Sequence, residues 1–266
     1  MIRAVSAIHP TEPRRTSWAE PRRGAILGRD EIHVWKADVD LDERAIGPLV
    51  ELLSPQEMGR ANRFRFDRDR ARFIVRRALL RTLVGHSTRR RPADLVIVTN
   101  AWGKPMLSGH DGACIQFSVS HSDSVVILAL TSGREVGVDV ERIRHIPECL
   151  AMARRFLAAK DVEALCALDG LARSRAFLLR WTETEALLKA RGVSLAGYLD
   201  AASSLDGGPG ARSDGGSTGS SWSLAAFDAG DDALGSVASL GSAWKPVYLQ
   251  TPKEPEDWPS GASGVS

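Results

Sequence analysis

Three acidic residues, far apart in the sequence, could together bind a divalent cation. Asp139 and Glu141 lie two positions apart in the stretch 136–141, where apolar and polar residues alternate. Side chains two apart in a strand point to the same face, and two carboxylates so close repel each other unless a cation lies between them. Mg²⁺ typically binds one or two protein carboxylates together with substrate phosphates. The pair alone fits a magnesium site but favours the ordinary polar face of a half-exposed strand, because such triplets are common; a third carboxylate changes this interpretation.

The third acid, Glu185, lies on an expected helix over residues 174–190. It falls within a mostly apolar stripe, one turn after Trp181 and one turn before Lys189. A carboxylate on a core-facing stripe costs free energy unless it is paired or bound to a metal. The alternative is an i, i+4 ion pair with Lys189, worth only about 0.2–0.5 kcal/mol. Glu183 points away from the stripe, and we expect it on the surface.

Basic and polar residues elsewhere in the chain could bind phosphate. Twelve arginines lie between residues 60 and 91, against two aspartates. A block of this density either binds phosphate or forms a solvated helix face. Ser120 and His121 end an expected strand, and Lys104 lies in the turn Gly103-Lys104-Pro105. Each of these is a weak signal alone.

The elements that position these residues can be read from hydrophobic periodicity. We expect strands over 33–39, 94–99, 115–120, 124–131 and 136–141. We expect helices over 44–53, 56–62, 71–83 (ended by Gly85), 148–157, 159–168 and 174–190. The runs 222–227 and 234–240 could add edge strands. Strands before residue 141 and helices after it predict an α+β fold rather than a doubly wound parallel sheet.

Composition excludes several classes of protein. The 266 residues are 43% hydrophobic and 26% charged, which suits one large globular domain or two small ones. No apolar run approaches the roughly 18–20 residues of a membrane span, so we expect no membrane partner. The net charge of +2 is too small by itself to indicate nucleic acid. Three scattered cysteines and a first segment without a secretory signal predict a cytoplasmic protein.

Three segments lack the apolar residues needed to pack. Residues 1–30 show no sustained apolar period, 201–221 are rich in Gly and Ser, and 246–266 form a polar tail. Such stretches bury too little apolar surface to offset the entropy of ordering. We expect the two ends to be disordered and the Gly/Ser-rich segment to be flexible.

Taken together, these motifs resemble the 4′-phosphopantetheinyl transferase superfamily, of the surfactin-synthetase-activating (Sfp) type. The resemblance covers roughly residues 31–195, and Arg63-Phe64 with the helix around Arg72 resembles the basic segment of the family. The matching motifs are Gly103-Lys-Pro105, Phe117-Ser-Val-Ser-His-Ser122, Gly137-Val-Asp-Val-Glu141 and Trp181-Thr-Glu-Thr-Glu-Ala-Leu-Leu-Lys189.

The resemblance implies an enzyme and a fold. The enzyme would transfer 4′-phosphopantetheine from coenzyme A to a serine of an apo acyl- or peptidyl-carrier protein, releasing adenosine 3′,5′-bisphosphate. It would require Mg²⁺, with Mn²⁺ as an alternative. The fold would be a pseudo-dimer of two similar α+β halves, here 31–132 and 133–245, with the active site in the cleft between them. We expect a monomer, because the two halves already supply the cleft.

Residue roles follow from the same resemblance, position by position. Asp139, Glu141 and Glu185 would bind the metal, and Glu185 could also act as the general base on the carrier serine. Lys189 and His121 would assist at the phosphates. The expected coenzyme A contacts are Arg60, Arg63, Arg72, Lys104, Ser120, His121 and Lys189. The chain departs from the family at Thr184 and Glu57, which stand where lysines are common.

Three other functions stay open. A basic nucleic-acid-binding protein would explain the arginines but leave the three acids unused. A magnesium-dependent phosphohydrolase would use the same acids without a carrier protein. An inactive homologue would keep the fold alone.

Overall fold

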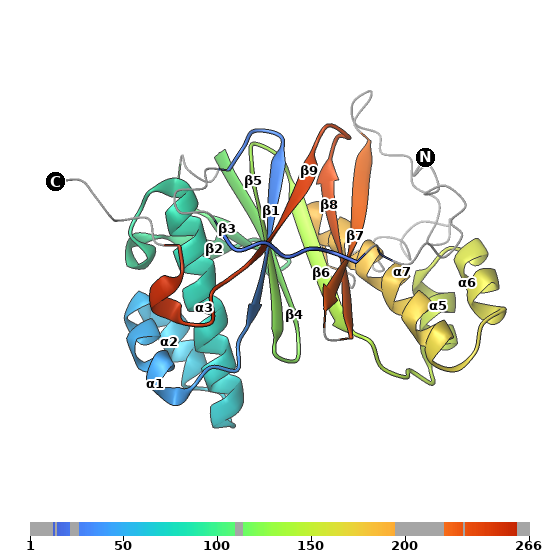
Figure 1. The fold of residues 1–266 in the computed structure, drawn as a ribbon, viewed down its shortest axis with the longest axis horizontal. Coiled ribbons are helices and arrows are strands. Elements are labelled where there is room, and N and C mark those ends of the chain that lie inside the picture. The colour runs from blue at the N-terminus through green and yellow to red at the C-terminus, as the bar shows by residue number, and fades with distance from the viewer. Residues whose placement is uncertain are drawn as a thin grey trace. The chain divides into compact units, whose positions relative to one another are not determined.

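The computed structural model describes residues 13, 15–21, 27–109, 114–194, 221–230 and 232–259, drawn as coloured ribbon in Figure 1. The chain divides into two compact units. Ser17–Asn100, Pro105–Glu135 and Ala243–Ser266 form the first, here called the N-terminal unit. Ala101–Lys104 and Val136–Ser242, with the first sixteen residues, form the second, the C-terminal unit.

A four-stranded sheet is the framework of the N-terminal unit. The strands lie in the order β4-β5-β1-β9, with β1 antiparallel to β5 and parallel to β9. Their bounds are β1 Glu31–Asp38, β4 Ile115–Ser122, β5 Val125–Ser132 and β9 Lys245–Gln250. The hairpin expected between β4 and β5 is confirmed, with Asp123 in the left-handed conformation (φ 52°) at its turn.

Helices pack beside this sheet, and the longest buries its apolar face in the core of the unit. The bounds are α1 Glu43–Ile46, a 3₁₀ helix Gly47–Leu52, α2 Pro55–Ala61 and α3 Asp67–Thr88. A short 3₁₀ helix, Pro92–Asp94, leads to the ribbon of β2 Ile97–Thr99 and β3 Pro105–Leu107. The strand expected over 94–99 is therefore shorter than predicted.

Gly85 does not end α3, contrary to our expectation. The helix continues to Thr88 and ends at Arg89, which adopts the left-handed conformation (φ 55°). The chain then turns back so closely that a Cβ at Gly85 would lie 2.7 Å from the carbonyl oxygen of Arg90. Gly85 is thus required by the close approach of the returning backbone, not by a helix end.

The C-terminal unit packs helices on a three-stranded antiparallel sheet of order β6-β8-β7. Its strands are β6 Val136–Arg142, β7 Trp222–Gly230 and β8 Ala233–Leu240. Its helices are α5 Cys149–Phe156, α6 Ala159–Cys166 and α7 Gly170–Ala190. α7 packs against β6 and β8 (Figure 1). β8 lies in the middle of the sheet, so the edge position that we expected for it is wrong.

The expected disorder at the two ends is wrong for the residues that the structure describes there. β9 extends the first sheet, and Trp258 is buried, with its indole N–H donating to the carbonyl of Pro252 at 3.0 Å. Ala19 forms a bridge to Leu249. Pairing with β1 satisfies the backbone of β9, and Trp258 buries its ring in the core of the same unit. The Gly/Ser-rich residues up to 220 lie outside the described part of the chain.

The α+β class is confirmed, since each unit combines antiparallel strand pairs with a long helix. None of the helices in the described ranges has both the length and the apolar character to cross a membrane.

Candidate functional site

A close contact between β6 and α7 holds the acidic motif of the C-terminal unit. Gly137 of β6 lies against the backbone of α7, where a Cβ would collide with the carbonyl of Ala186 and the N–H of Ala190. Two residues further along β6, Asp139 is 4% exposed, whereas Glu141 is half-buried. The absence of a side chain at Gly137 therefore lets the strand bring its carboxylates next to the last turns of α7.

Lys189 of α7 neutralises the buried carboxylate. Its ammonium donates to Oδ1 of Asp139 at 2.6 Å, and the Lys189 side chain is 29% exposed. A charge-assisted contact of this length is strong, particularly where one partner is shielded from water. Asp139 and Lys189, both predicted site residues, are thus in direct contact.

Glu185 lies within reach of the same charges. Burial raises the pKa of the Glu185 carboxyl, Lys189 opposes that effect, and the charges of Asp139 and Glu141 raise the pKa further. A carboxylate responds in this way only to charged groups close to it. Asp139, Glu141 and Lys189 are therefore all close enough for their charges to act on Glu185.

These acids do not form a ready-made metal centre. In the ranges that the structure describes, no group of three or more His, Cys, Asp or Glu side chains is arranged so that it could hold a metal ion. The donor chemistry nevertheless fits magnesium, because the carboxylates of Asp139, Glu141 and Glu185 are the kind of oxygen ligand that Mg²⁺ prefers. The magnesium site stays a prediction.

Glu183 is not the surface residue that we expected. It is half-buried and accepts a 2.6 Å hydrogen bond from Arg180, which also lies 3.6 Å from Asp161. Burial raises the pKa of Glu183, although Arg180 counteracts this. The side chain serves an ion-pair network at the other face of α7.

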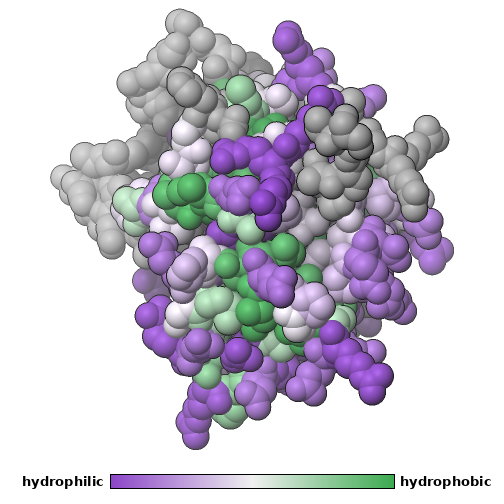
Figure 2. Space-filling model, turned by 90° about the vertical axis from the view of Figure 1, so that its left-hand side faces the viewer, coloured by the Kyte–Doolittle hydropathy of each residue, from purple (hydrophilic) through white to green (hydrophobic). Residues whose placement is uncertain are grey.

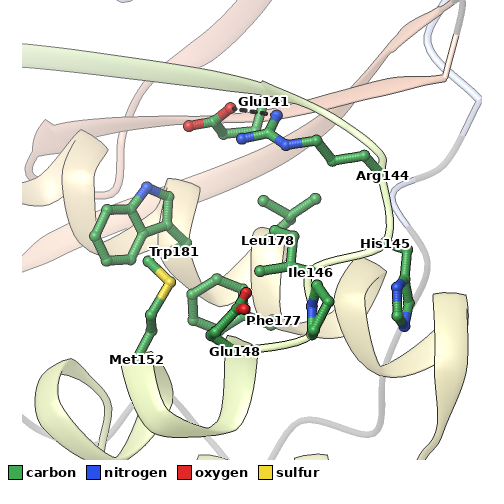
Figure 3. A pocket seen from close by; sticks show the side chains of 10 residues that line it. Glu141, Arg144, His145, Ile146, Glu148, Met152, Phe177, Leu178 and Trp181 are labelled. Atoms are coloured by element: carbon green, nitrogen blue, oxygen red, sulfur yellow. Dashed lines mark ion pairs between the residues drawn. The ribbon is translucent and has the colours of Figure 1, made fainter.

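A pocket of about 270 Å³ opens beside Glu141 (Figure 3). Trp181, from α7, lies next to Met152, from α5, at its apolar side, and the guanidinium of Arg144 lies 3.7 Å from the Glu141 carboxylate at its rim. The lining residues are Glu141, Arg144, His145, Ile146, Pro147, Glu148, Met152, Phe177, Leu178 and Trp181. Of these residues, sequence reasoning singled out only Glu141 as functional. The segment 144–148, directly after the acidic strand, was a signal that could have found part of the rest.

Lys104 faces the backbone of the C-terminal unit. Its ammonium donates to the carbonyls of Val136 at 3.0 Å and Ala190 at 3.4 Å. The turn 101–104 is thereby attached to the start of β6 and the end of α7. A contact of Lys104 with the nucleotide end of coenzyme A stays a prediction.

The remaining predicted residues belong to the N-terminal unit. Arg72 of α3 forms a bidentate ion pair with Asp40, with both contacts at 2.6 Å. The Arg60 guanidinium lies over the Phe73 ring, 5.3 Å from its centroid, and Arg63 is exposed. Ser120 is buried and His121 is exposed, so they occupy opposite faces of β4. That these residues share one cleft with the acids also stays a prediction.

The arginines of residues 60–91 include a structural pair, Arg77 and Arg81, and exposed residues such as Arg60 and Arg63. Arg77 and Arg81 both donate to Glu57, and Arg81, which is 1% exposed, also donates to the carbonyls of Pro92 and Leu95. These two arginines are structural, whereas Arg60 and Arg63 are exposed. The density of arginines in the sequence could not distinguish the two groups, because it did not identify the buried Glu57.

Two family models match the chain in succession. The model described as the 4′-phosphopantetheinyl transferase superfamily matches residues 135–237. The model described as the N-terminal part of 4′-phosphopantetheinyl transferases matches residues 42–133. The first match contains Asp139, Glu141, Glu185 and Lys189, and the second contains the arginine block.

Curated relatives agree with these matches. The 4′-phosphopantetheinyl transferase HetI of Nostoc is 29% identical over 233 residues, 87% of this chain and 97% of that protein. A phosphopantetheinyl transferase of Thraustochytrium is 28% identical over 162 residues, 57% of this chain and 56% of its own. The 4′-phosphopantetheinyl transferase psf-1 of Bacillus pumilus is 29% identical over 160 residues, 58% of this chain and 66% of its own.

Proposed function

Since the chain belongs to the 4′-phosphopantetheinyl transferase superfamily and is a transferase, we propose that it transfers 4′-phosphopantetheine from coenzyme A to a serine hydroxyl of an apo acyl- or peptidyl-carrier protein. The observation that carries the proposal is the convergence of three carboxylates and one ammonium on β6 and α7. One buried and several half-buried ionisable groups that act on one another are typical of catalytic sites.

The acids and Lys189 have complementary tasks at the pyrophosphate of coenzyme A. Asp139, Glu141 and Glu185 would hold Mg²⁺, which when bound neutralises negative charge on the pyrophosphate. Lys189, at 29% exposure, can pass from Asp139 to a phosphate oxygen by rotating its flexible side chain. Phosphoryl transfer depends mainly on such positioning and charge neutralisation.

The transfer itself needs a base. The serine oxygen of the carrier forms a bond to the phosphorus that bears pantetheine, while the bond from that phosphorus to the bridging oxygen breaks. Adenosine 3′,5′-bisphosphate leaves with the bridging oxygen, and Glu185 accepts the serine proton. In the absence of a bound cation, burial and two neighbouring acids raise the pKa of Glu185, and a carboxylate with a raised pKa is a better proton acceptor than an ordinary one.

The pocket beside Glu141 is a candidate docking site for the carrier protein. Its apolar side, which includes Trp181, Phe177 and Met152, could receive an apolar side chain next to the carrier serine (Figure 3). Arg144 is exposed at the rim, where it could contact an acidic carrier surface. A carrier docked there would bring its serine to the side of the acids.

The N-terminal unit offers cations for the nucleotide end of the same substrate. We assign this task to Arg60 and Arg63, with Ser120 and His121 of the same unit and Lys104 of the C-terminal unit as further contacts implied by the motifs. Arg72 is engaged by Asp40, so its part would be to support that surface. We further propose that the protein acts in the cytoplasm as a monomer.

The proposal is tested by incubating the protein with coenzyme A, MgCl₂ and an apo-carrier protein. We expect the carrier to gain the mass of one phosphopantetheine group. Asp139→Ala and Glu185→Gln should each abolish the gain while the circular dichroism spectrum stays native. Glu163→Gln, a change at an exposed acid on α6, is the matched control and should retain activity.

Two results would contradict the proposal. Near-normal transfer by the Asp139 or Glu185 variant would remove these acids from the mechanism. Release of adenosine 3′,5′-bisphosphate at the same rate without any carrier would instead identify a phosphohydrolase. Titration of Mn²⁺, followed by electron paramagnetic resonance, checks the metal site independently of activity, and it should lose affinity in the Asp139 variant.

A further inference from the structure

A pair of buried hydroxyls joins α7 to the middle strand of the C-terminal sheet. Thr182 of α7 and Ser236 of β8 are both 0% exposed, and their hydroxyl oxygens lie 3.0 Å apart. The Thr182 hydroxyl donates to the carbonyl of Leu179 at 3.0 Å, within the same helix. Because a hydroxyl carries a single hydrogen, Ser236 is the donor in the contact between the two. The contact is therefore directional and joins one residue of the helix to one residue of the sheet.

The hydroxyl pair lies beside the acidic motif. Ser236 is the partner of Asp139 in the pairing of β8 with β6, and residues directly opposite each other in an antiparallel pair point to the same face. That face is covered by α7, since Asp139 contacts Lys189 there and Ser236 contacts Thr182. Along α7, Glu185 comes three residues after Thr182 and four before Lys189. Glu185 therefore lies between two attachments of its helix to the sheet.

Small residues make the apolar contacts beside the hydroxyl pair. Gly137 lies against the backbone at Ala186 and Ala190, and these two alanines form an apolar cluster with Ala238 of β8. Apolar contacts are non-directional, whereas a satisfied buried polar contact favours one arrangement of the packed elements. On a mostly hydrophilic face such as the one in Figure 2, solvent replaces a lost hydroxyl. Beneath α7 the remaining hydroxyl would stay buried without its partner.

We propose that Thr182 and Ser236 are positioning residues for the transfer reaction. Their contact fixes α7 on β8 and so keeps Glu185 and Lys189 beside Asp139. The inference deepens the proposed function and rests on it for the reaction concerned. Neither hydroxyl touches coenzyme A or the carrier, because both are shielded from solvent. The pair acts on the rate through the acids and Lys189.

Steady-state kinetics of the carrier assay, recorded well below the melting temperature, measures this effect. Thr182→Val, which keeps the branched shape and removes the hydroxyl, and Ser236→Ala should each lower kcat by about 10- to 100-fold. KM for coenzyme A should change by less than about 3-fold, because Arg60 and Arg63, assigned to its nucleotide end, belong to the N-terminal unit. Thr182→Ser retains the hydroxyl and should recover most of kcat.

Thr131→Val is the matched control for lost stability. Thr131 lies on β5 of the N-terminal unit, is 0% exposed, and donates its hydroxyl to the carbonyl of Glu31 at 3.3 Å. Like Thr182→Val, this change should lower the melting temperature by about 2–8 °C, but it should leave kcat unchanged. Equal losses of kcat in the two variants would overturn the proposal, because activity would then only follow stability.

A double variant separates positioning from packing. Thr182→Val combined with Ser236→Ala removes both hydroxyls, leaves neither one buried without its partner, and should recover most of the melting temperature. Its kcat should stay low, because the remaining apolar contacts beside the pair are non-directional. A kcat that recovered together with the melting temperature would overturn the positioning role.

Urea unfolding tests the pair without any carrier. Thr182 and Lys189 are two turns apart on α7, about 10 Å, a separation at which independent sites usually have additive effects. Lys189→Met should lower the unfolding midpoint less in the Thr182→Val chain than in the wild type, because the ion pair with Asp139 is already loosened there. Additive midpoints would overturn the proposal. If the wild type modified no carrier while the midpoints were non-additive, the proposed function would fail and the hold of this pair on α7 would stand.

Discussion

The flexible side chain of Lys189 supplies a counter-charge to the buried carboxylate of Asp139. Lys189 lies 2.6 Å from Oδ1, while the Asp139 side chain is only 6% exposed. Removing one partner of a buried ion pair costs more than the pair contributes, because the remaining charge is left desolvated. Asp139 should therefore be sensitive to any change in the cations around it.

Lys189→Met should lower the free energy of unfolding by about 2–3 kcal/mol in EDTA, since the carboxylate then stays buried without its ammonium partner. If Asp139 belongs to a magnesium site, MgCl₂ should restore more stability to this variant than it adds to the wild type. Urea unfolding with and without MgCl₂ measures both effects.

Lys160→Met, at an exposed position on α6, is the control and should change little in either buffer. A Lys189 variant that gains no more from MgCl₂ than the wild type does would count against a cation site at Asp139.

At the scale of elements, one acid ties α2 to α3. Glu57 completes a capping box with Ser54 at the start of α2 and accepts hydrogen bonds from Arg77 and Arg81 of α3. Burial disfavours its charge, but the backbone N–H of Ser54 and the two arginines outweigh burial and lower the pKa of Glu57. The contact also fixes α2, which carries Arg60.

Glu57→Gln should destabilise the protein by about 2–4 kcal/mol at pH 7, because two arginines lose their counter-charge. The pKa of Glu57 is lower in the folded state than in the unfolded state. Its contribution is therefore complete above the ordinary glutamate pKa of about 4.3 and is lost as pH falls through the folded value. The difference between wild type and variant, measured by urea unfolding, should shrink below about pH 4. A difference that stayed constant with pH would show that the charge of Glu57 is not what matters.

A second prediction at the scale of elements concerns the contact of β6 with α7. Gly137→Ala should push the strand away from the helix backbone, cost about 3 kcal/mol or more, and separate Asp139 from Lys189. Chemical denaturation and the carrier assay should both show losses.

Gly59→Ala is the matched control, because a Cβ there meets nothing within 4 Å and the residue lies inside α2. It should stabilise the protein by about 0.5–1 kcal/mol. Equal stability of the two alanine variants would mean that β6 and α7 tolerate a wider spacing.

Hydrophobic periodicity in the sequence predicts the helices and strands. It does not show which residues are buried by contacts with residues distant in the sequence. The alternation around Asp139 and the stripe around Glu185 predicted β6 and α7, because each pattern is local. Nothing local shows that Glu57 is buried beneath two arginines, or that Gly137 touches α7. Polar contacts between elements became visible only once those elements were packed.

At the scale of the whole molecule, the chain leaves the N-terminal unit and later returns to it. After the last strand of the C-terminal unit, Ala243–Ser266 rejoin the N-terminal unit, where β9 pairs with β1. Leu249 and Trp258 enter the same core as α3. The polar composition of this tail concealed its role, because in its described residues one strand and the apolar side chains of Val247, Leu249 and Trp258 carry it.

A chain ending at Ser242 should therefore lose stability in the N-terminal unit, although most of that unit remains. β1 would lose its parallel partner, and the core would lose Leu249 and Trp258, a truncation comparable to the larger core deletions of about 3–5 kcal/mol. A chain ending at Pro259 keeps β9 and Trp258 and serves as the control. Urea unfolding followed by circular dichroism should give a lower midpoint, or an added early transition, for the shorter chain alone. If both chains unfolded at the same midpoint, β9 would be an accessory strand and the N-terminal unit would be complete without it.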